Sequence, residues 1–102
     1  MHEIKRSTKR INGEDITTYS REVVRANILE VEAGTNGYHG GDAGHGSKTY
    51  LRIQDKGGTA CELTMLDGGF DIALYGDCEL HTFIEALKFA VRVLEEESQG
   101  YE

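Results

Sequence analysis

Residues 48–75, KTYLRIQDKGGTACELTMLDGGFDIALY, contain three short segments in which apolar and polar residues alternate. The segments 48–54, 59–66 and 70–75 are separated by the turn sequences DKGG (55–58) and DGG (67–69). Strands with one buried face alternate in this way, and short glycine turns join antiparallel neighbours. This stretch therefore predicts a three-stranded antiparallel meander whose apolar face holds Leu51, Ile53, Cys61, Leu63, Met65, Phe70, Ile72 and Leu74.

Residues 79–98 repeat apolar side chains at the period of an amphipathic helix. Asp77 is a candidate N-cap and Gly100 a candidate stop. Three glutamates at 95–97 lie where the helix dipole disfavours anions, so we expect fraying there. Phe89 and Val93 widen the apolar stripe on one side and would reach toward another subunit. The stripe predicted to cover the sheet consists of Leu80, Phe83, Ile84, Leu87, Ala90, Val91 and Leu94.

The segment before the meander is also rich in β-formers, over residues 15–33. Alternation changes parity near Asn27, which indicates a bulge, or a short helix over 20–27. Asn12-Gly13 predicts a hairpin between residues 3–11 and 15–20. Residues 1–14 are polar and basic, which favours a solvated strand or tail, or an arm that docks on an acidic partner.

These elements predict one α+β domain over residues 1–102. It holds an antiparallel sheet of four to five strands, with one C-terminal amphipathic helix packed on one face. The second face of the sheet is mixed rather than apolar, so it is free to meet water, a ligand or a twin subunit. Its predicted members are Tyr50, Arg52, Glu62, Thr64, Asp71 and Tyr75.

Composition narrows the class of protein. A net charge of −7 argues against nucleic acid as a partner, because DNA affinity comes mainly from neutralising phosphates. Two cysteines form no disulfide framework, so we expect reduced thiols and a cytoplasmic protein. We expect no membrane span and no secretion signal, because no long apolar run occurs. Domains this small often gain stability by association, which favours a homodimer.

Residues 34–47, GTNGYHGGDAGHGS, hold six of the thirteen glycines. Their spacing resembles a phosphate-binding P-loop, but strand-like residues follow where that motif requires a helix. A weaker anion-binding nest of backbone N–H groups remains open, with nearby cations adding charge. The loop and its neighbours therefore form the candidate ligand site, with Tyr38, His39, Gly40, Gly41, Asp42, Gly44, His45, Gly46, Lys48 and Arg52.

A metal site is the second hypothesis for this loop. His39, Asp42 and His45 are spaced H-x2-D-x2-H, and such ligands suit zinc, iron or manganese in a metal-dependent hydrolase. A loop, however, does not place residues at this spacing on a common face. A nucleophilic site would need Ser47 near His45, or a cysteine near His81, and no G-x-S-x-G elbow occurs.

Two further interpretations stay open. The glycines could serve backbone geometry alone, in a structured or a mobile loop. Tyr38 beside two imidazoles could instead form a stacking surface for a ring. No motif identifies a cofactor. We therefore expect a non-enzymatic module that binds a small anionic, nucleotide-like ligand or a protein, or an acidic protein-facing adaptor or inhibitor.

Residues 29–53, LEVEAGTNGYHGGDAGHGSKTYLRI, resemble a segment of small uncharacterised proteins encoded in mobile elements and phages of Firmicutes. The resemblance covers this central segment and fades toward both ends. It implies an accessory role on a mobile element, such as sequestering a ligand or masking a host protein. It transfers no active site.

Overall fold

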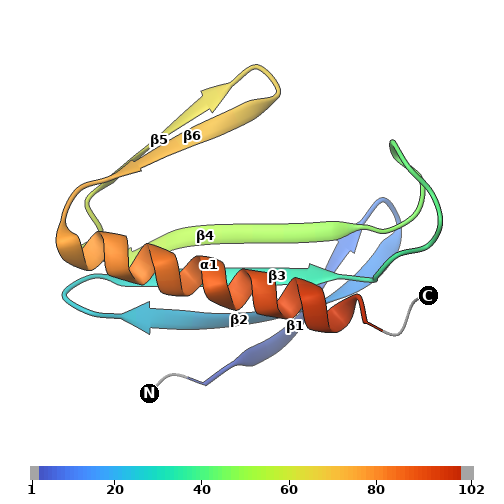
Figure 1. Ribbon diagram of the computed structural model, residues 1–102, viewed down its shortest axis with the longest axis horizontal. Helices are drawn as coiled ribbons and strands as arrows, with labels where there is room; N and C mark the ends of the chain where they lie inside the picture. The colour runs from blue at the N-terminus through green and yellow to red at the C-terminus, as the bar shows by residue number, and fades with distance from the viewer. Residues whose placement is uncertain (1–2, 100–102) are drawn as a thin grey trace.

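The computed structural model describes residues 3–99 as an antiparallel sheet covered by one helix, with a separate hairpin (Figure 1). The four-stranded sheet has the order β1-β2-β3-β4, and a two-stranded sheet joins β5 to β6. This confirms the predicted α+β class with a C-terminal helix on one face. The elements are β1 (Lys5–Ile11), β2 (Glu14–Val24), β3 (Ile28–Thr35), β4 (Thr49–Gly57), β5 (Cys61–Leu66), β6 (Gly69–Leu74) and α1 (Asp77–Glu97).

The N-terminal hairpin forms as predicted. Asn12 and Gly13 both adopt positive φ, at 49° and 82°, as the tight turn between β1 and β2 requires. Lys5 pairs with Ser20 at one end of the hairpin and Ile11 pairs with Glu14 at the other. The basic residues from 5 to 11 therefore form an edge strand rather than a frayed tail.

The chain reverses at Asn27, and the short helix considered over 20–27 does not form. Residues 25–27 form a bend that ends β2 and begins β3, and the register irregularity beside it lies between Ile28 and Leu29, in the pairing of β3 with β4. Asn27 is 1% exposed, and its amide donates to Thr59 Oγ1 at 2.9 Å and to Thr82 Oγ1 at 3.0 Å. Core residues Val23, Leu29, Val31 and Ala33 share one parity across the bend, whereas Val24 is 41% exposed, so the side of the chain that faces the core does not change at Asn27.

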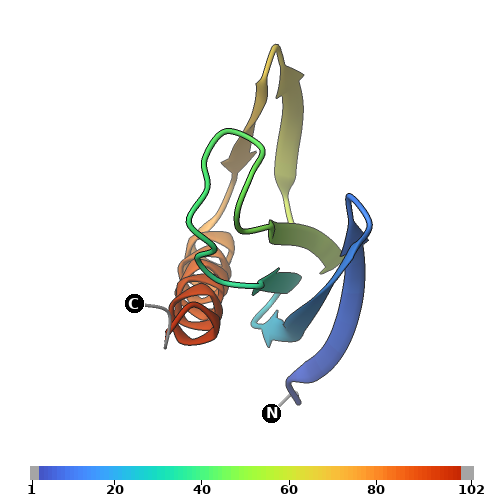
Figure 2. The same cartoon turned by 90° about the vertical axis from the view of Figure 1, so that its right-hand side faces the viewer.

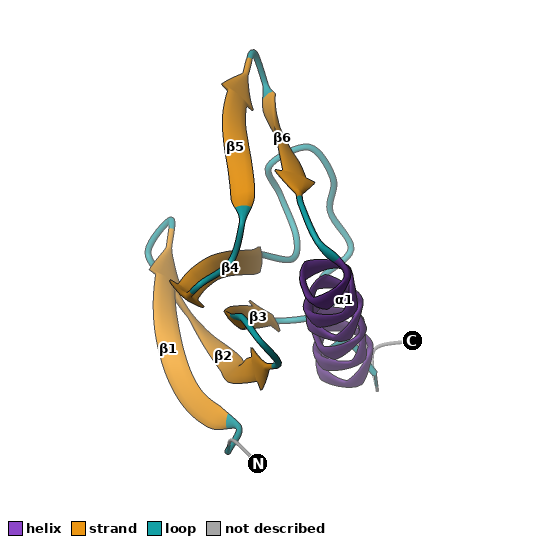
Figure 3. Cartoon of the chain, turned by 90° about the vertical axis from the view of Figure 1, so that its left-hand side faces the viewer, coloured by secondary structure: helices purple, strands orange, loops and turns teal. Residues whose placement is uncertain are grey.

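The predicted meander is wrong at one junction. β4 continues to Gly57, and β5 pairs with β6 rather than with β4. Asp55 Oδ1 accepts hydrogen bonds from the N–H groups of Gly57 at 2.8 Å and Thr59 at 3.1 Å. Those bonds lower the pKa of Asp55 and hold the turn, which includes Gly58 at φ 71°. The turn directs the hairpin β5–β6 away from the sheet (Figures 2 and 3).

Helix α1 packs on β3 and to a smaller extent on β2, through a face that keeps Phe83, Ala90 and Leu94 of the predicted stripe but not its other members. Two alanines, Ala86 and Ala90, lie on the buried face and let the helix backbone approach the sheet. Phe89 and Val93, predicted to reach toward another subunit, are 3% and 6% exposed. The core consists of Val23, Leu29, Val31, Ala33, Ala86, Phe89, Ala90 and Val93.

Four members of the predicted stripe are instead exposed, at 39% to 59%. We call these residues, Leu80, Ile84, Leu87 and Val91, the helix stripe.

The helix ends differ in part from expectation. Gly76 is the N-cap and no side chain caps the first turn, so Asp77 is the first helical residue rather than the cap. The predicted stop at Gly100 lies outside the described residues. Between residues 3 and 99, no helix combines the length and apolar character needed to cross a bilayer.

Candidate functional site

The glycine loop is fastened at its base. Asn36 and Lys48 bridge the two ends, since Asn36 N–H donates to the Lys48 carbonyl at 3.2 Å and Lys48 N–H donates to Asn36 Oδ1 at 2.8 Å. The Asn36 amide also donates to Glu14 Oε1 at 3.0 Å, which ties the loop to the β1–β2 hairpin. These hydrogen bonds, which we call the clamp, therefore fix the positions at which the rest of the loop begins and ends.

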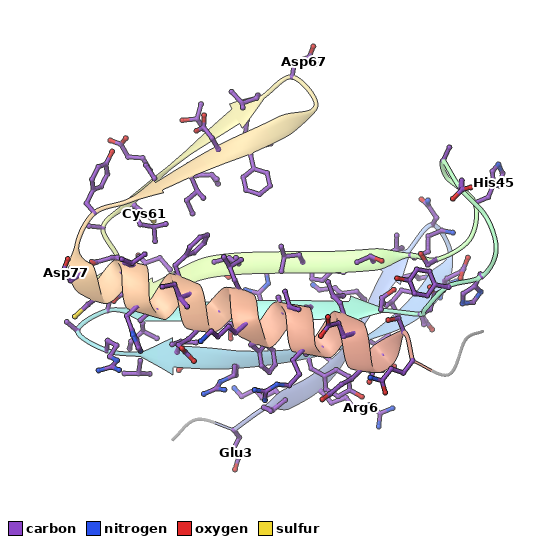
Figure 4. The ribbon with its side chains drawn as sticks, viewed as in Figure 1. Glu3, Arg6, His45, Cys61, Asp67 and Asp77 are labelled. Carbon is purple, nitrogen blue, oxygen red and sulfur yellow. The ribbon has the colours of Figure 1, made fainter. Side chains whose placement is uncertain are left out.

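The middle of the loop closes on itself. A methyl group added at Gly41 would meet backbone atoms of His45 and Gly46 at 2.7 and 2.8 Å, so only glycine permits this crossing. The His45 N–H donates to the Asp42 carbonyl at 3.1 Å and forms the turn at the tip. Gly34 belongs to β3 rather than to the loop. Figure 4 shows His45 at the outer end, far from the helix start at Asp77.

The two cations predicted to contact a ligand are engaged by carboxylates. Lys48 Nζ lies 3.5 Å from Glu14 Oε2 and donates to the Gly46 carbonyl at 3.2 Å. Arg52 Nη1 lies 2.8 Å from Glu30 Oε1, and its Nη2 lies 2.8 Å from Glu32 Oε1. Both groups neutralise protein carboxylates, so little charge is left for an anionic ligand.

Glu32 and Arg52 form a polar cluster on the sheet face opposite α1. Burial by itself raises the pKa of Glu32, but hydrogen bonds from Thr18 and Arg52 outweigh it and the pKa lies below its ordinary value. Burial acts to lower the pKa of Arg52, and the paired carboxylates reverse this and raise it. The cluster is a structural ion pair. The alternation of Glu30 and Glu32 with apolar residues predicts that both glutamates lie on one face, but it does not predict that they pair with Arg52.

A small cavity of about 200 Å³ lies at the loop base, lined by Thr35, Gly37, Tyr38, Ser47, Thr49 and Leu94. Pockets that enclose small ligands usually measure about 300–1,000 Å³. Gly37 lies against the last turn of α1, whose carbonyl end carries partial negative charge and three glutamates. Size and charge both disfavour a small anion here.

The three proposed metal ligands stay apart. Across residues 3–99, no three His, Cys, Asp or Glu side chains gather where they could hold a metal ion. His39 Nε2 lies 2.7 Å from the Asn36 carbonyl, so this ring faces the loop base. The residues present therefore do not fit a metal site.

The proposed nucleophiles are not assembled either. His81 Nε2 accepts a hydrogen bond from Arg25 Nη2 at 2.8 Å. Cys61 and Cys78 are free thiols and partly exposed, as expected from their number. No described contact joins His81 to a cysteine, and none joins Ser47 to His45.

An apolar surface that the sequence assigned to the core lies open instead. β5 and β6 pair so that six apolar side chains share one side, which we call the hairpin face: Cys61, Leu63, Met65, Phe70, Ile72 and Leu74. Leu63, Met65 and Phe70 are 59% to 75% exposed. The alternation identified the members of this face, but no signal in the sequence shows that it lacks a cover.

No family model matches the chain, and neither a curated protein nor a solved structure matches it.

Proposed function

We propose that the chain is a small non-enzymatic binding module whose loop 34–47 engages a protein partner. The proposal rests on one observation. Hydrogen bonds hold the base of the loop in place, and the Tyr38 side chain beyond that base is 63% exposed. Tyrosine on a glycine-rich frame supplies a large amphipathic contact at low conformational entropy, as in antibody loops. A preorganised loop also loses little freedom on binding.

The geometry favours a protein over an enclosed ligand. Residues 38–45 are all exposed, and the cavity beside them is smaller than most ligand pockets. A convex loop matches a concavity on another protein better than it encloses a small molecule. An accessory role that masks another protein would also agree with the resemblance of residues 29–53 to proteins of mobile elements.

A comparative capture experiment tests the proposal. The immobilised chain, Tyr38→Ala and the control Thr8→Ala on exposed strand β1 are exposed to extract from cells that naturally express the chain. We expect at least one protein to be retained by the wild type and by Thr8→Ala, and to be lost with Tyr38→Ala. Capture of the same proteins by Tyr38→Ala, and by a chain with residues 38–45 replaced by a serine linker, would contradict the proposal.

A stacking site for a nucleotide-like ligand is the second candidate, favoured by the same exposed ring beside His39. A thermal-shift series with nucleotides and cyclic nucleotides tests it. A rise in melting temperature that disappears in Tyr38→Ala would support this form, and the absence of any shift would remove it.

A further inference from the structure

The hairpin β5–β6 is open to solvent over the half of its apolar side nearer the tip, where Leu63, Met65 and Phe70 are exposed, while Cys61, Ile72 and Leu74 are half-buried. Its two strands pack closely only on each other among the described elements. An isolated two-stranded hairpin is marginally stable in water, and its exposed apolar face adds a driving force for burial. Figure 4 shows its tip, Asp67, far from the helix and the sheet. The hairpin therefore needs a cover that residues 3–99 of the same chain do not supply.

The helix stripe is a second uncovered apolar surface. His81 contacts Arg25 in the bend after β2, and Phe89 contacts Arg21 of β2, so that flank of α1 faces β2. By helical period, the helix stripe lies on the side of α1 that is turned away from the buried Ala86, Phe89 and Val93. Leu51 of β4 is a further exposed apolar side chain, because it pairs with core residue Ala33 yet is 47% exposed. Helix, edge strand and hairpin thus each carry exposed apolar side chains, which together form an incompletely covered apolar region.

We propose that this region is closed by a second copy of the chain, with the hairpin face of each copy packed on the helix stripe of the other. One two-fold axis generates both contacts, so each copy supplies what the other lacks. A permanent need for cover favours a partner that is always present at equal concentration, and a second copy meets that condition. This inference goes beyond the proposed function, which uses the loop.

The exposed area agrees with a missing partner. The accessible surface is 6934 Å², whereas a compact monomer of 11.3 kDa exposes about 5,700 Å². The excess is roughly 1,200 Å², and a standard stable interface buries about 800 Å² per partner. The radius of gyration, 14.8 Å, likewise exceeds the value of about 12.8 Å expected for 102 residues.

The two apolar surfaces match in length. The stripe from Leu80 to Val91 rises about 16 Å along the helix, and the hairpin from Cys61 to Met65 spans about 14 Å. The charges beside the stripe are mixed, since Glu85 lies 3.8 Å from Lys88 and Glu95 lines the same groove as Lys88 and Arg92, so apolar contact carries the match.

Sedimentation equilibrium with charged variants tests this arrangement. Met65→Lys places a charge on the most exposed residue of the hairpin face, near its tip, and Leu87→Asp places one on the helix stripe. Both positions are exposed in the single chain, so each variant should keep its fold, as circular dichroism would verify. We expect a wild-type dimer, and a dissociation constant raised at least tenfold in each variant because an unpaired charge would be buried. Thr64→Lys, on the other hairpin side, should leave the dimer intact.

Mixing the two variants identifies which surfaces meet. In a mixed dimer, one contact would pair the lysine introduced at position 65 of one chain with the aspartate introduced at position 87 of the other. The second contact would be wild type on both sides. The mixture of Met65→Lys with Leu87→Asp should therefore dimerise more tightly than either variant alone.

Three outcomes would overturn the inference. The first is a wild-type chain that stays monomeric from micromolar to millimolar concentration. The others are equal weakening by Met65→Lys and Thr64→Lys, and a mixture no tighter than the separate variants. None of these outcomes depends on the loop, so each is distinguishable from a failure of the proposed function.

Discussion

At the scale of single residues, Glu32 is a buried carboxylate that depends on particular hydrogen-bond and ion-pair partners. It is 5% exposed, accepts a hydrogen bond from Thr18 at 2.5 Å and pairs with Arg52. A buried carboxylate is tolerated only when such partners replace the water that it has lost. The cluster therefore fixes the packing of β2, β3 and β4 on the face opposite the helix.

Glu32→Gln should lower the free energy of unfolding at neutral pH by about 1–3 kcal/mol, because a charged acceptor is lost and Arg52 keeps fewer partners. The pKa of Glu32 is lower in the folded state than in the unfolded state. Its contribution is therefore complete above the ordinary glutamate pKa and is lost as pH falls through the folded value. Urea unfolding at neutral and acidic pH should show the difference from wild type shrinking in acid. Asp15→Asn, in an exposed pair with Arg10, is the control and should change little.

Gly34 is constrained by contact rather than by φ. A methyl group there would collide with the Thr17 carbonyl oxygen and approach Thr18 Cα at 2.9 Å. Gly34→Ala should therefore separate β2 from β3 and lower the free energy of unfolding by about 1–3 kcal/mol. Gly69→Ala is the matched control, since a methyl group at Gly69 meets nothing within 4 Å. Equal melting temperatures for the two variants would show that the strands can move apart freely.

At the scale of elements, the junction at Asn27 connects the β2–β3 bend, the segment before the hairpin and the helix. Its amide donates to Thr59 and Thr82, and Thr59 Oγ1 donates to the Ile28 carbonyl at 3.1 Å. Two segments that are distant in the sequence therefore depend on one buried side chain for their relative position.

Asn27→Ala should lower the free energy of unfolding by about 1–3 kcal/mol, because the variant leaves Thr59 and Thr82 with fewer partners in a buried site. It should also increase amide hydrogen exchange in residues 58–60 and in the first turns of α1, since their shared anchor is gone. Thr8→Ala, on the exposed edge strand β1, serves as the control. Unchanged exchange at both segments would contradict this role for Asn27.

At the scale of the whole molecule, the exposed apolar surface links stability to concentration. If a second copy covers the hairpin face and the helix stripe, association stabilises the folded state by mass action. Two copies would also carry two copies of loop 34–47, so binding to a repeated partner would gain from multivalency.

The melting temperature of the wild type should therefore rise with protein concentration, and that of Met65→Lys should rise less. Differential scanning calorimetry over a hundredfold range, about 10 µM to 1 mM, measures this dependence directly. Thr64→Lys should follow the wild type. A melting temperature that is independent of concentration in all three proteins would contradict association through this region.

The sequence was most informative where interactions are local. Asn12-Gly13 defined a hairpin turn because two adjacent residues there must adopt positive φ. Alternation placed Cys61, Leu63 and Met65 on one side of a strand for the same local reason. The glycine loop was recognisable from composition. Its clamp joins Asn36, Lys48 and Glu14, which come from separate segments, so it leaves no pattern in the sequence.

By itself, the sequence determined the α+β class, the strand and turn pattern and a C-terminal helix, because these depend on propensity and period within a few residues. Only the tertiary structure decided which helix side is buried. Apolar side chains cover more than half of α1, so periodicity permitted several orientations, and close approach at Ala86 and Ala90 selected one. It also decided that the hairpin stands apart and that Arg52 binds carboxylates, because those outcomes depend on contacts between residues far apart in the chain.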